Sequence, residues 1–235
     1  MGIEKLNKLL VVSPLLPGIS MKASFLFLLL SMTAIQSLAQ DPLIVAHRGT
    51  SKDAPENTLP AFQLAWQQEA DAIEGDFHLT KDGVIVCIHD ENTEKYTGVD
   101  WEVKEKTLTE LRSLDVGAYQ STKFKGTVIP TIAEVFATVP ENKKIYIEVK
   151  CGKEIVPTLL QEIGKSGLTN DQIVVISFDE EVIRDTKSLA PHLKACWLVD
   201  FKAGRNRDGS RIPSLDSVLE ILEEIKADGL SSNPD

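Results

Sequence analysis

The sequence has few cysteines, no surplus of positive charge and a single long hydrophobic run, and each shortage excludes a class of protein. Only three of its 235 residues are cysteines, at Cys87, Cys151 and Cys196. Their spacing fits no zinc motif, and an odd number cannot pair completely into disulfides. All three lie within or just after apolar segments, so we expect them to be buried free thiols.

The shortage of positive charge argues against a nucleic-acid partner. The chain has 25 Lys and Arg residues against 35 Asp and Glu residues, a formal net charge of -10. A surface of this sign repels polyanions such as DNA and RNA. The sequence also lacks internal repeats. Its length and composition predict a single soluble domain. No segment indicates a particular oligomeric state.

The one long hydrophobic run lies near the amino terminus. Residues 23–30 are apolar except for Ser24, follow Lys22 and lead into small residues that end at Ala39. This order is typical of a signal peptide, and the run is too short for a stable membrane span. We therefore expect residues 1–40 to be a leader that is cleaved near Ala39. Residues 41–235 would then form an exported domain, periplasmic or extracellular.

From residue 43 onward, short β-branched segments alternate with segments of helical periodicity. This alternation predicts an α/β fold, a TIM-type (β/α) barrel with a parallel sheet covered by helices. Strands are expected at 43–46, 72–77, 144–149, 172–177, 194–198 and 227–231. Helices are expected at 58–68, 131–139, 156–166, 180–190 and 214–226.

The barrel is expected to be incomplete. A closed barrel of this type has eight strands, and the sequence stops soon after the sixth expected strand. An unclosed parallel sheet leaves an exposed edge, so we expect a sequence shortened from a longer protein.

Two features interrupt the alternation after the second strand. Asp82-Gly83 between apolar segments predicts a two-residue hairpin loop, which would place His89 opposite Asp76. Residues 90–129 are polar and rich in turns, with a helical patch at 107–114. They predict a small insertion over the mouth of the barrel, where loops usually shape a ligand site.

Three carboxylates lie near the ends of expected strands. Glu74 and Asp76 are two residues apart on the second strand, so they share one face of the sheet, and Glu148 lies near the end of the third. The carboxyl ends of barrel strands meet at one rim, which would bring the three together. Carboxylates this close repel one another unless a hard cation lies between them, which favours one divalent ion, Mg²⁺ or Ca²⁺.

Basic and titratable side chains are expected at the same rim. His47 closes the first strand, Arg48 follows it, Lys150 lies two residues after Glu148, and the hairpin delivers His89. Histidine suits proton transfer near neutral pH, so two of them beside a metal suggest an acid and base pair. Taken alone, Glu148 and Lys150 would be interpreted as a plain ion pair.

Six short motifs occur in a fixed order along the chain. They are His47-Arg48-Gly49, Pro55-Glu56-Asn57-Thr58, Glu74-Gly75-Asp76, Thr80-Lys81-Asp82-Gly83, His89-Asp90 and Glu148-Val149-Lys150. In order and spacing this set resembles the signature of the glycerophosphodiester phosphodiesterase family. The resemblance extends from about residue 43 to the end of the chain.

The resemblance implies an activity and a role for seven residues. The ion would be held by Glu74, Asp76 and Glu148, protons transferred by His47 and His89, and the phosphate held by Arg48 and Lys150. The implied reaction is hydrolysis of a small glycerophosphodiester to glycerol 3-phosphate and an alcohol. The neighbouring glycerol hydroxyl would attack phosphorus, and water would then open the cyclic phosphate.

Two other functions remain open. A hydrophobic groove within residues 90–129 would favour a lysophospholipid-type phosphodiesterase. A non-catalytic phosphate-ester binding protein on the same scaffold is the second alternative. The presence of both His47 and His89 counts against it, because binding alone needs no proton-transfer pair.

Several single residues also carry two interpretations. Glu56 and Asn57 either cap the helix that follows or contact the substrate. Phe178 either lines the alcohol pocket or packs in the core. His78 and His192 are expected on the surface.

Overall fold

The computed structural model describes residues 42–200 and 213–232, and the predicted leader lies outside this part of the chain. The described residues from Leu43 onward group into one compact unit. None of the helices within the described ranges is both long and apolar enough to cross a membrane.

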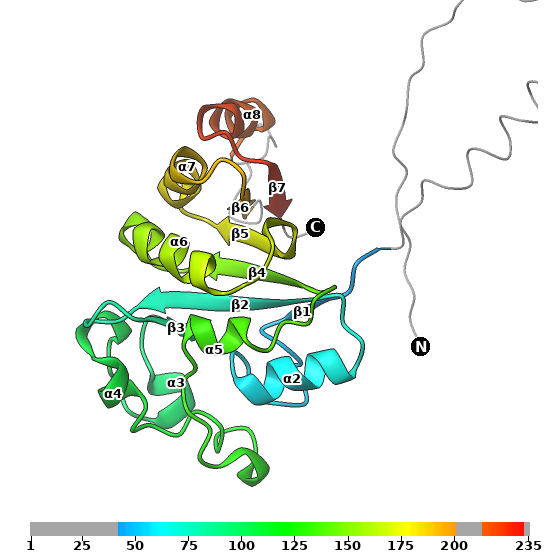
Figure 1. Ribbon diagram of the computed structural model, residues 1–235. Helices are drawn as coiled ribbons and strands as arrows, with labels where there is room; N and C mark the ends of the chain where they lie inside the picture. Colours follow the sequence, from blue (N-terminus) through cyan, green and yellow to red (C-terminus); the bar gives the residue numbers. More distant parts are fainter. Residues whose placement is uncertain (1–41, 201–212, 233–235) are drawn as a thin grey trace, which may run out of the picture. The chain divides into compact units, whose positions relative to one another are not determined.

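One sheet of seven strands forms the centre of this unit (Figure 1). Six parallel strands follow the order β1-β2-β4-β5-β6-β7, and β3 pairs antiparallel with β2. Their bounds are β1 Val45–His47, β2 Ala72–Leu79, β3 Ile85–Cys87, β4 Lys144–Val149, β5 Ile173–Ser177, β6 Lys194–Val199 and β7 Gly229–Ser232. All six predicted parallel strands are confirmed. In the described ranges the sheet is open, with β1 and β7 at its ends, so the structure is part of a TIM-type barrel.

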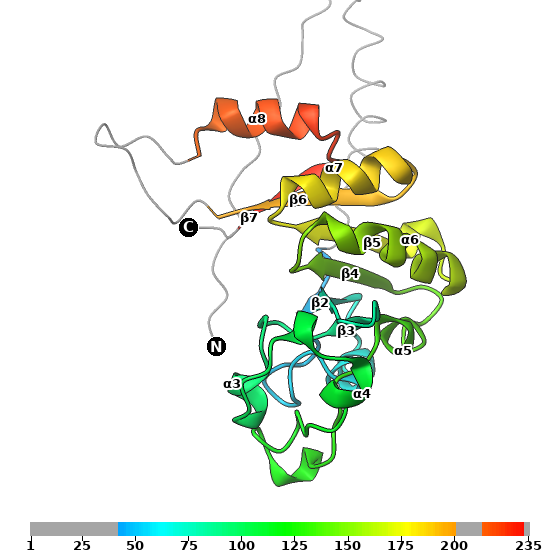
Figure 2. The ribbon, with the colours of Figure 1, turned by 90° about the vertical axis from the view of Figure 1, so that its left-hand side faces the viewer.

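Helices cover one face of the sheet (Figures 1 and 2). They are α2 Leu59–Gln67, α5 Ile132–Phe136, α6 Val156–Lys165, α7 Glu180–Leu189 and α8 Leu215–Glu224. Their apolar side chains pack with strand residues such as Ile73, Ile147 and Val175 in the main core. Because side chains alternate along a strand, Glu74 and Glu148 point to the opposite face, which the helices leave open.

The hairpin between β2 and β3 has a longer loop than predicted. Leu79 pairs with Ile85, and the backbone N–H of Thr80 donates to the carbonyl of Val84 at 2.9 Å. The loop is therefore residues 81–83, with Gly83 at φ 76°, as a three-residue loop requires. The two-residue prediction was wrong because an Asp-Gly pair occurs in both kinds of loop.

The changed register also changes how His89 reaches the site. The residue opposite Asp76 is Ile88, whose backbone N–H donates to the Asp76 carbonyl at 2.9 Å. The predicted pairing of His89 with Asp76 is thus wrong by one residue. The chain leaves β3 after Cys87, and this departure carries the His89 side chain to Lys150, 3.4 Å away.

The predicted insertion forms its own small core. It contains α3 Glu94–Thr97, α4 Leu108–Leu111 and the 3-10 turns η2 Val103–Glu105 and η3 Thr122–Phe124. Its buried apolar residues pack against β3 and its flank, in a cluster of Val86, Ile88, Tyr96, Val103, Leu111, Val116 and Ile129. Tyr96 and Leu111 of the insertion are therefore used in packing, which gives no support to a hydrophobic groove built from them.

Candidate active site

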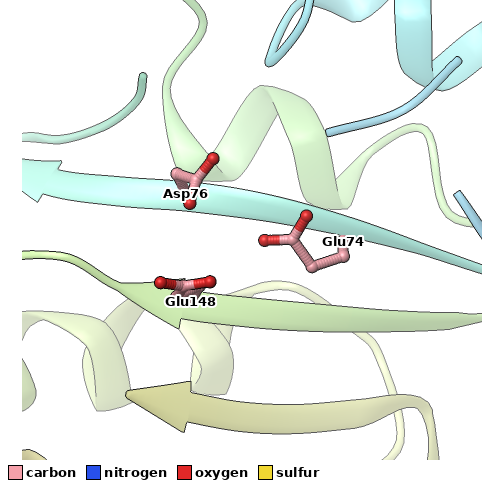
Figure 3. A group of neighbouring side chains, drawn as sticks. All are labelled: Glu74, Asp76 and Glu148. Atoms are coloured by element: carbon pink, nitrogen blue, oxygen red, sulfur yellow. The ribbon is translucent and has the colours of Figure 1, made fainter. Parts of the chain in front are cut away.

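Three carboxylates from two neighbouring strands meet on the open face of the sheet (Figure 3). Asp76 on β2 and Glu148 on β4 are register partners, and Glu74 lies two residues earlier on β2. One oxygen of each carboxylate lies within 4.8 Å of the others. All three are buried, with exposed fractions of 5% for Glu74, 0% for Asp76 and 8% for Glu148.

Burial of so much negative charge is incompletely compensated by the protein itself. Burial, followed by the charge of Asp76, raises the pKa of Glu74 to about 8, although the Arg48 backbone N–H donates to its Oε2 at 2.9 Å. Oε1 of Glu74 and Oδ1 of Asp76 are buried without a hydrogen-bond partner. Such oxygens are costly unless something binds them, and an all-oxygen set is what a hard divalent cation prefers. The residues present therefore fit such an ion.

The two predicted phosphate-binding side chains border this cluster. Nε of Arg48 lies 3.3 Å from Oδ2 of Asp76. Nζ of Lys150 lies 2.8 Å from Oε1 of Glu148 and 3.8 Å from Oδ1 of Asp76. The structure thus places both cations beside the carboxylates, where they offset part of the negative charge.

Both predicted histidines line one cavity of about 1130 Å³, together with Glu74, Glu148 and Lys150. The His47 side chain is 66% exposed, and its Nε2 lies 3.8 Å from Oε2 of Glu74. Partial burial, followed by the charge of Arg48, lowers the pKa of His47.

His89 has a carboxylate partner within the same motif. Its Nδ1 lies 2.5 Å from Oδ1 of Asp90, and its Nε2 lies 3.4 Å from Nζ of Lys150. An Nδ1–H that donates to Asp90 leaves Nε2 as the nitrogen able to accept a proton. In that tautomer Nε2 faces Nζ of Lys150 with its lone pair.

Glu56 and Asn57 do not cap the helix, so that interpretation was wrong. The N-cap of α2 is Thr58, which accepts from the backbone N–H of Ala61 at 3.5 Å. Glu56 instead accepts hydrogen bonds from Lys95 at 2.7 Å and Tyr96 at 2.8 Å, both in α3 of the insertion. It also contacts Nη1 of Arg48 at 3.4 Å, so it links the insertion to the site.

Asn57 contacts a predicted metal ligand directly. Its side-chain amide donates to Oδ2 of Asp76 at 2.8 Å, and its carbonyl oxygen accepts from the backbone N–H of Asp76 at 3.0 Å. Two signals for Asn57 were present in the sequence, its place in the Pro55-Glu56-Asn57-Thr58 motif and its position before a capping Thr, and the second is equally typical of a helix start.

Two further expectations for single residues need correction. His78 is buried, 7% exposed, and its Nε2 lies 3.1 Å from the backbone carbonyl of His89, whereas His192 is exposed as predicted. The core alternative for Phe178 is wrong, because this side chain is 51% exposed at the rim of the cavity, with its ring centroid 5.9 Å from Nζ of Lys150.

The three cysteines were expected to be buried free thiols. All three thiols are free, but only Cys87 is fully buried, and Cys151 and Cys196 are partly buried. Gly49 has φ 74°, and a Cβ there would lie 2.7 Å from the backbone carbon of Ala61. The requirement for glycine beside Arg48 is therefore both conformational and steric.

Fold and site together define a (β/α)-barrel enzyme with its polar residues at the carboxyl ends of the strands. The model of the glycerophosphoryl diester phosphodiesterase family matches residues 47–233. The chain therefore belongs to this family of phosphoric diester hydrolases.

Individual relatives agree with this assignment. A glycerophosphodiester phosphodiesterase of Caldanaerobacter subterraneus subsp. tengcongensis is 37% identical over 204 residues, covering 82% of this chain and 84% of the relative. A phosphodiesterase of Oleispira antarctica, solved in complex with the product sn-glycerol-3-phosphate, has a TM-score of 0.71 at 28% identity, covering 81% of this chain and 74% of that one. The glycerophosphodiester phosphodiesterase of Thermotoga maritima has a TM-score of 0.63 at 29% identity, covering 82% and 74%.

Proposed function

We propose that this chain hydrolyses glycerophosphodiesters to glycerol 3-phosphate and an alcohol, using one divalent cation, Mg²⁺ or Ca²⁺. The observation that carries the proposal is the buried cluster of Glu74, Asp76 and Glu148, in which two oxygens lack hydrogen-bond partners. When bound there, the cation would supply positive charge to the phosphoryl oxygens. Arg48 and Lys150 border the same cluster and would hold those oxygens by charge-assisted hydrogen bonds.

His47 and His89 would transfer the protons in both halves of the reaction. In the first half, one imidazole removes the proton of the glycerol hydroxyl as its oxygen bonds to phosphorus, and the other protonates the departing alcohol oxygen. In the second half, water attacks the cyclic phosphate and the two imidazoles exchange roles. Support comes from the fact that both line one cavity and from the contact between His89 and Asp90.

The proposed cellular location is outside the cytoplasm. The order of Lys22, the apolar residues 23–30 and the small residues up to Ala39 supports export through a cleaved leader. Expression in a bacterial host followed by amino-terminal sequencing of the periplasmic fraction tests this. A mature protein that still begins at Met1 or Met21 would contradict it.

The decisive test of the activity is incubation of the purified chain with glycerophosphocholine, in the presence of Mg²⁺, Ca²⁺ or EDTA. His47→Ala and His89→Ala should each abolish the release of glycerol 3-phosphate. His192→Ala is the matched control, because this histidine is exposed and should leave turnover unchanged. Full turnover in both site variants would contradict the mechanism. Binding of glycerophosphocholine without turnover by the unaltered chain would favour a non-catalytic phosphate-ester binding protein.

A further inference from the structure

Asn57 holds the Asp76 side chain through two hydrogen bonds of opposite direction. Its amide nitrogen donates to Oδ2 at 2.8 Å, and its carbonyl oxygen accepts from the Asp76 backbone N–H at 3.0 Å. The Cys87 thiol lies 3.2 Å from the same carbonyl oxygen and donates to it. A backbone N–H can only donate, so the orientation of the Asn57 amide is fixed by its partners.

These contacts leave the two oxygens of Asp76 in different surroundings. Oδ2 is bound by Asn57 and lies 3.3 Å from Nε of Arg48. Oδ1 is buried without a hydrogen-bond partner and lies 3.8 Å from Nζ of Lys150. Rotation of the carboxylate would break the bond to Asn57, so Oδ1 is the oxygen that remains available to a ligand.

The backbone of Asn57 is held in a conformation that few residues adopt. Its φ is 59°, in the left-handed region, where Asn is tolerated better than most residues other than glycine. The Asn57 N–H donates to the Arg48 carbonyl at 3.0 Å, and Thr58 begins the cap of α2. Asn57 is 3% exposed, so its side chain has no role at the surface.

We propose that Asn57 is a positioning residue for the cation site, which fixes Asp76 so that Oδ1 faces the ion. This inference rests on the proposed function, because it assumes the ion that Glu74, Asp76 and Glu148 would hold. Residues that orient a metal ligand typically contribute a factor of about 10 to 100 in metal affinity. The same loss is expected when the Asn57 side chain is removed.

The test measures ion binding without substrate. Titration calorimetry with Mg²⁺ and with Mn²⁺ compares the unaltered chain with Asn57→Gly, which keeps the left-handed backbone, and Asn57→Ser, whose side chain is too short to make both bonds. Thr58→Ala is the matched control, since it removes the adjacent helix cap and leaves the bonds to Asp76 intact. Thermal unfolding in EDTA records how much each change affects folding alone.

We expect the dissociation constant of the ion to rise by about 10- to 100-fold in both Asn57 variants and to stay within about threefold in Thr58→Ala. At saturating Mg²⁺ the kcat for glycerophosphocholine should recover most of its original value. An Asn57→Gly dissociation constant close to that of the unaltered chain would overturn the inference, and so would an equal loss in Thr58→Ala.

A measurement on the unaltered chain covers the case in which the variants do not fold. The side-chain amide resonance of Asn57 should be protected from exchange and should shift when Mg²⁺ is added, and an unresponsive resonance would overturn the inference. Failure of the unaltered chain to hydrolyse the substrate would instead contradict the proposed function, so the two failures are distinguishable.

Discussion

Lys150 and Glu148 form an ion pair of 2.8 Å at the end of β4, within the cavity that the two histidines line. An isolated Lys-Glu contact of this length would be interpreted as a simple ion pair. Here Nζ of Lys150 also lies 3.4 Å from Nε2 of His89, so its charge borders both the carboxylates and the imidazole of His89.

Replacement of Lys150 tests whether this charge acts in turnover. Lys150→Met should lower kcat/KM for glycerophosphocholine by about 100-fold, since loss of one preorganised donor to developing charge has an effect of this size. Lys153→Met is the control, because Lys153 pairs at 3.1 Å with Glu181 on the exposed surface. Similar kcat/KM values for the two variants would contradict a role of Lys150 in the reaction.

Asp90 should determine which nitrogen of His89 carries the proton. In Asp90→Asn the amide can donate to Nδ1, which would move the proton to Nε2 and block its acceptance of another. We expect kcat to fall by about 100-fold with little change in KM. Asp100→Asn, an exposed acid in the insertion, provides the comparison in the same steady-state assay. If KM alone changed, Asp90 would be acting in binding.

The buried Glu74 should make the stability of the ion-free chain depend on pH. Its pKa is raised from 4.5 to about 8 by burial and the neighbouring Asp76, so between these values the folded state binds more protons than the unfolded state. Stability should therefore fall as the pH rises from about 5 to about 8. Added Mg²⁺ should raise the Tm more at the upper end of this range, because the cation replaces the proton.

Thermal unfolding in EDTA and in Mg²⁺ across this pH range measures the effect. Glu74→Gln cannot titrate, so its Tm in EDTA should depend less on pH than that of the unaltered chain. If Tm in EDTA changed with pH equally in the two proteins, groups other than Glu74 would determine the pH dependence of stability.

The stability of the region around β7 should depend on the buried ammonium group of Lys187. Nζ of Lys187 donates to the carbonyls of Pro191 and Leu193 at 2.9 Å and to Oδ2 of Asp228 at 2.8 Å. The same Asp228 oxygen accepts from the backbone N–H of Ala195 at 2.8 Å. Asp228→Ala should lower the free energy of unfolding by about 2 kcal/mol, since it leaves a buried charge short of one partner.

Urea unfolding monitored by circular dichroism measures this loss. The control is Lys153→Gln, which breaks an exposed pair and should leave the urea midpoint unchanged. An unchanged urea midpoint for Asp228→Ala would mean that the contacts of Asp228 add nothing to the backbone hydrogen bonds between β6 and β7.

The sequence predicted the parallel strands well because short β-branched segments alternate with helical ones along the chain, and strands such as β2 and β5 are buried over nearly their whole length. Lys144–Val149 was predicted at its observed bounds, and the pairing of Asp76 with Glu148 follows from two parallel strands in register. What could be predicted from period and spacing was therefore which face each carboxylate occupies.

Contacts set by loops could not be predicted in this way. The register of the hairpin depends on whether Thr80 pairs with Val84, and one added loop residue moved the partner of Asp76 from His89 to Ile88. The burial of His78 follows from its contact with the His89 carbonyl, which no local pattern indicates. The role of Asn57 depends on a left-handed backbone that only the folded loop defines.

The loop between β1 and α2 has a consequence for attempts to make this protein more robust. Arg48 and Asn57 both adopt left-handed backbones, with φ of 57° and 59°, in which a side chain is strained by about 1 kcal/mol and glycine is not. Glycine would relieve this strain, but at Asn57 it would also remove two hydrogen bonds to the buried Asp76, a loss of about 1 to 3 kcal/mol. Relaxing left-handed residues to glycine therefore gives no net gain in this loop, and substitutions meant to raise heat resistance belong in parts of the chain that do not contact Asp76.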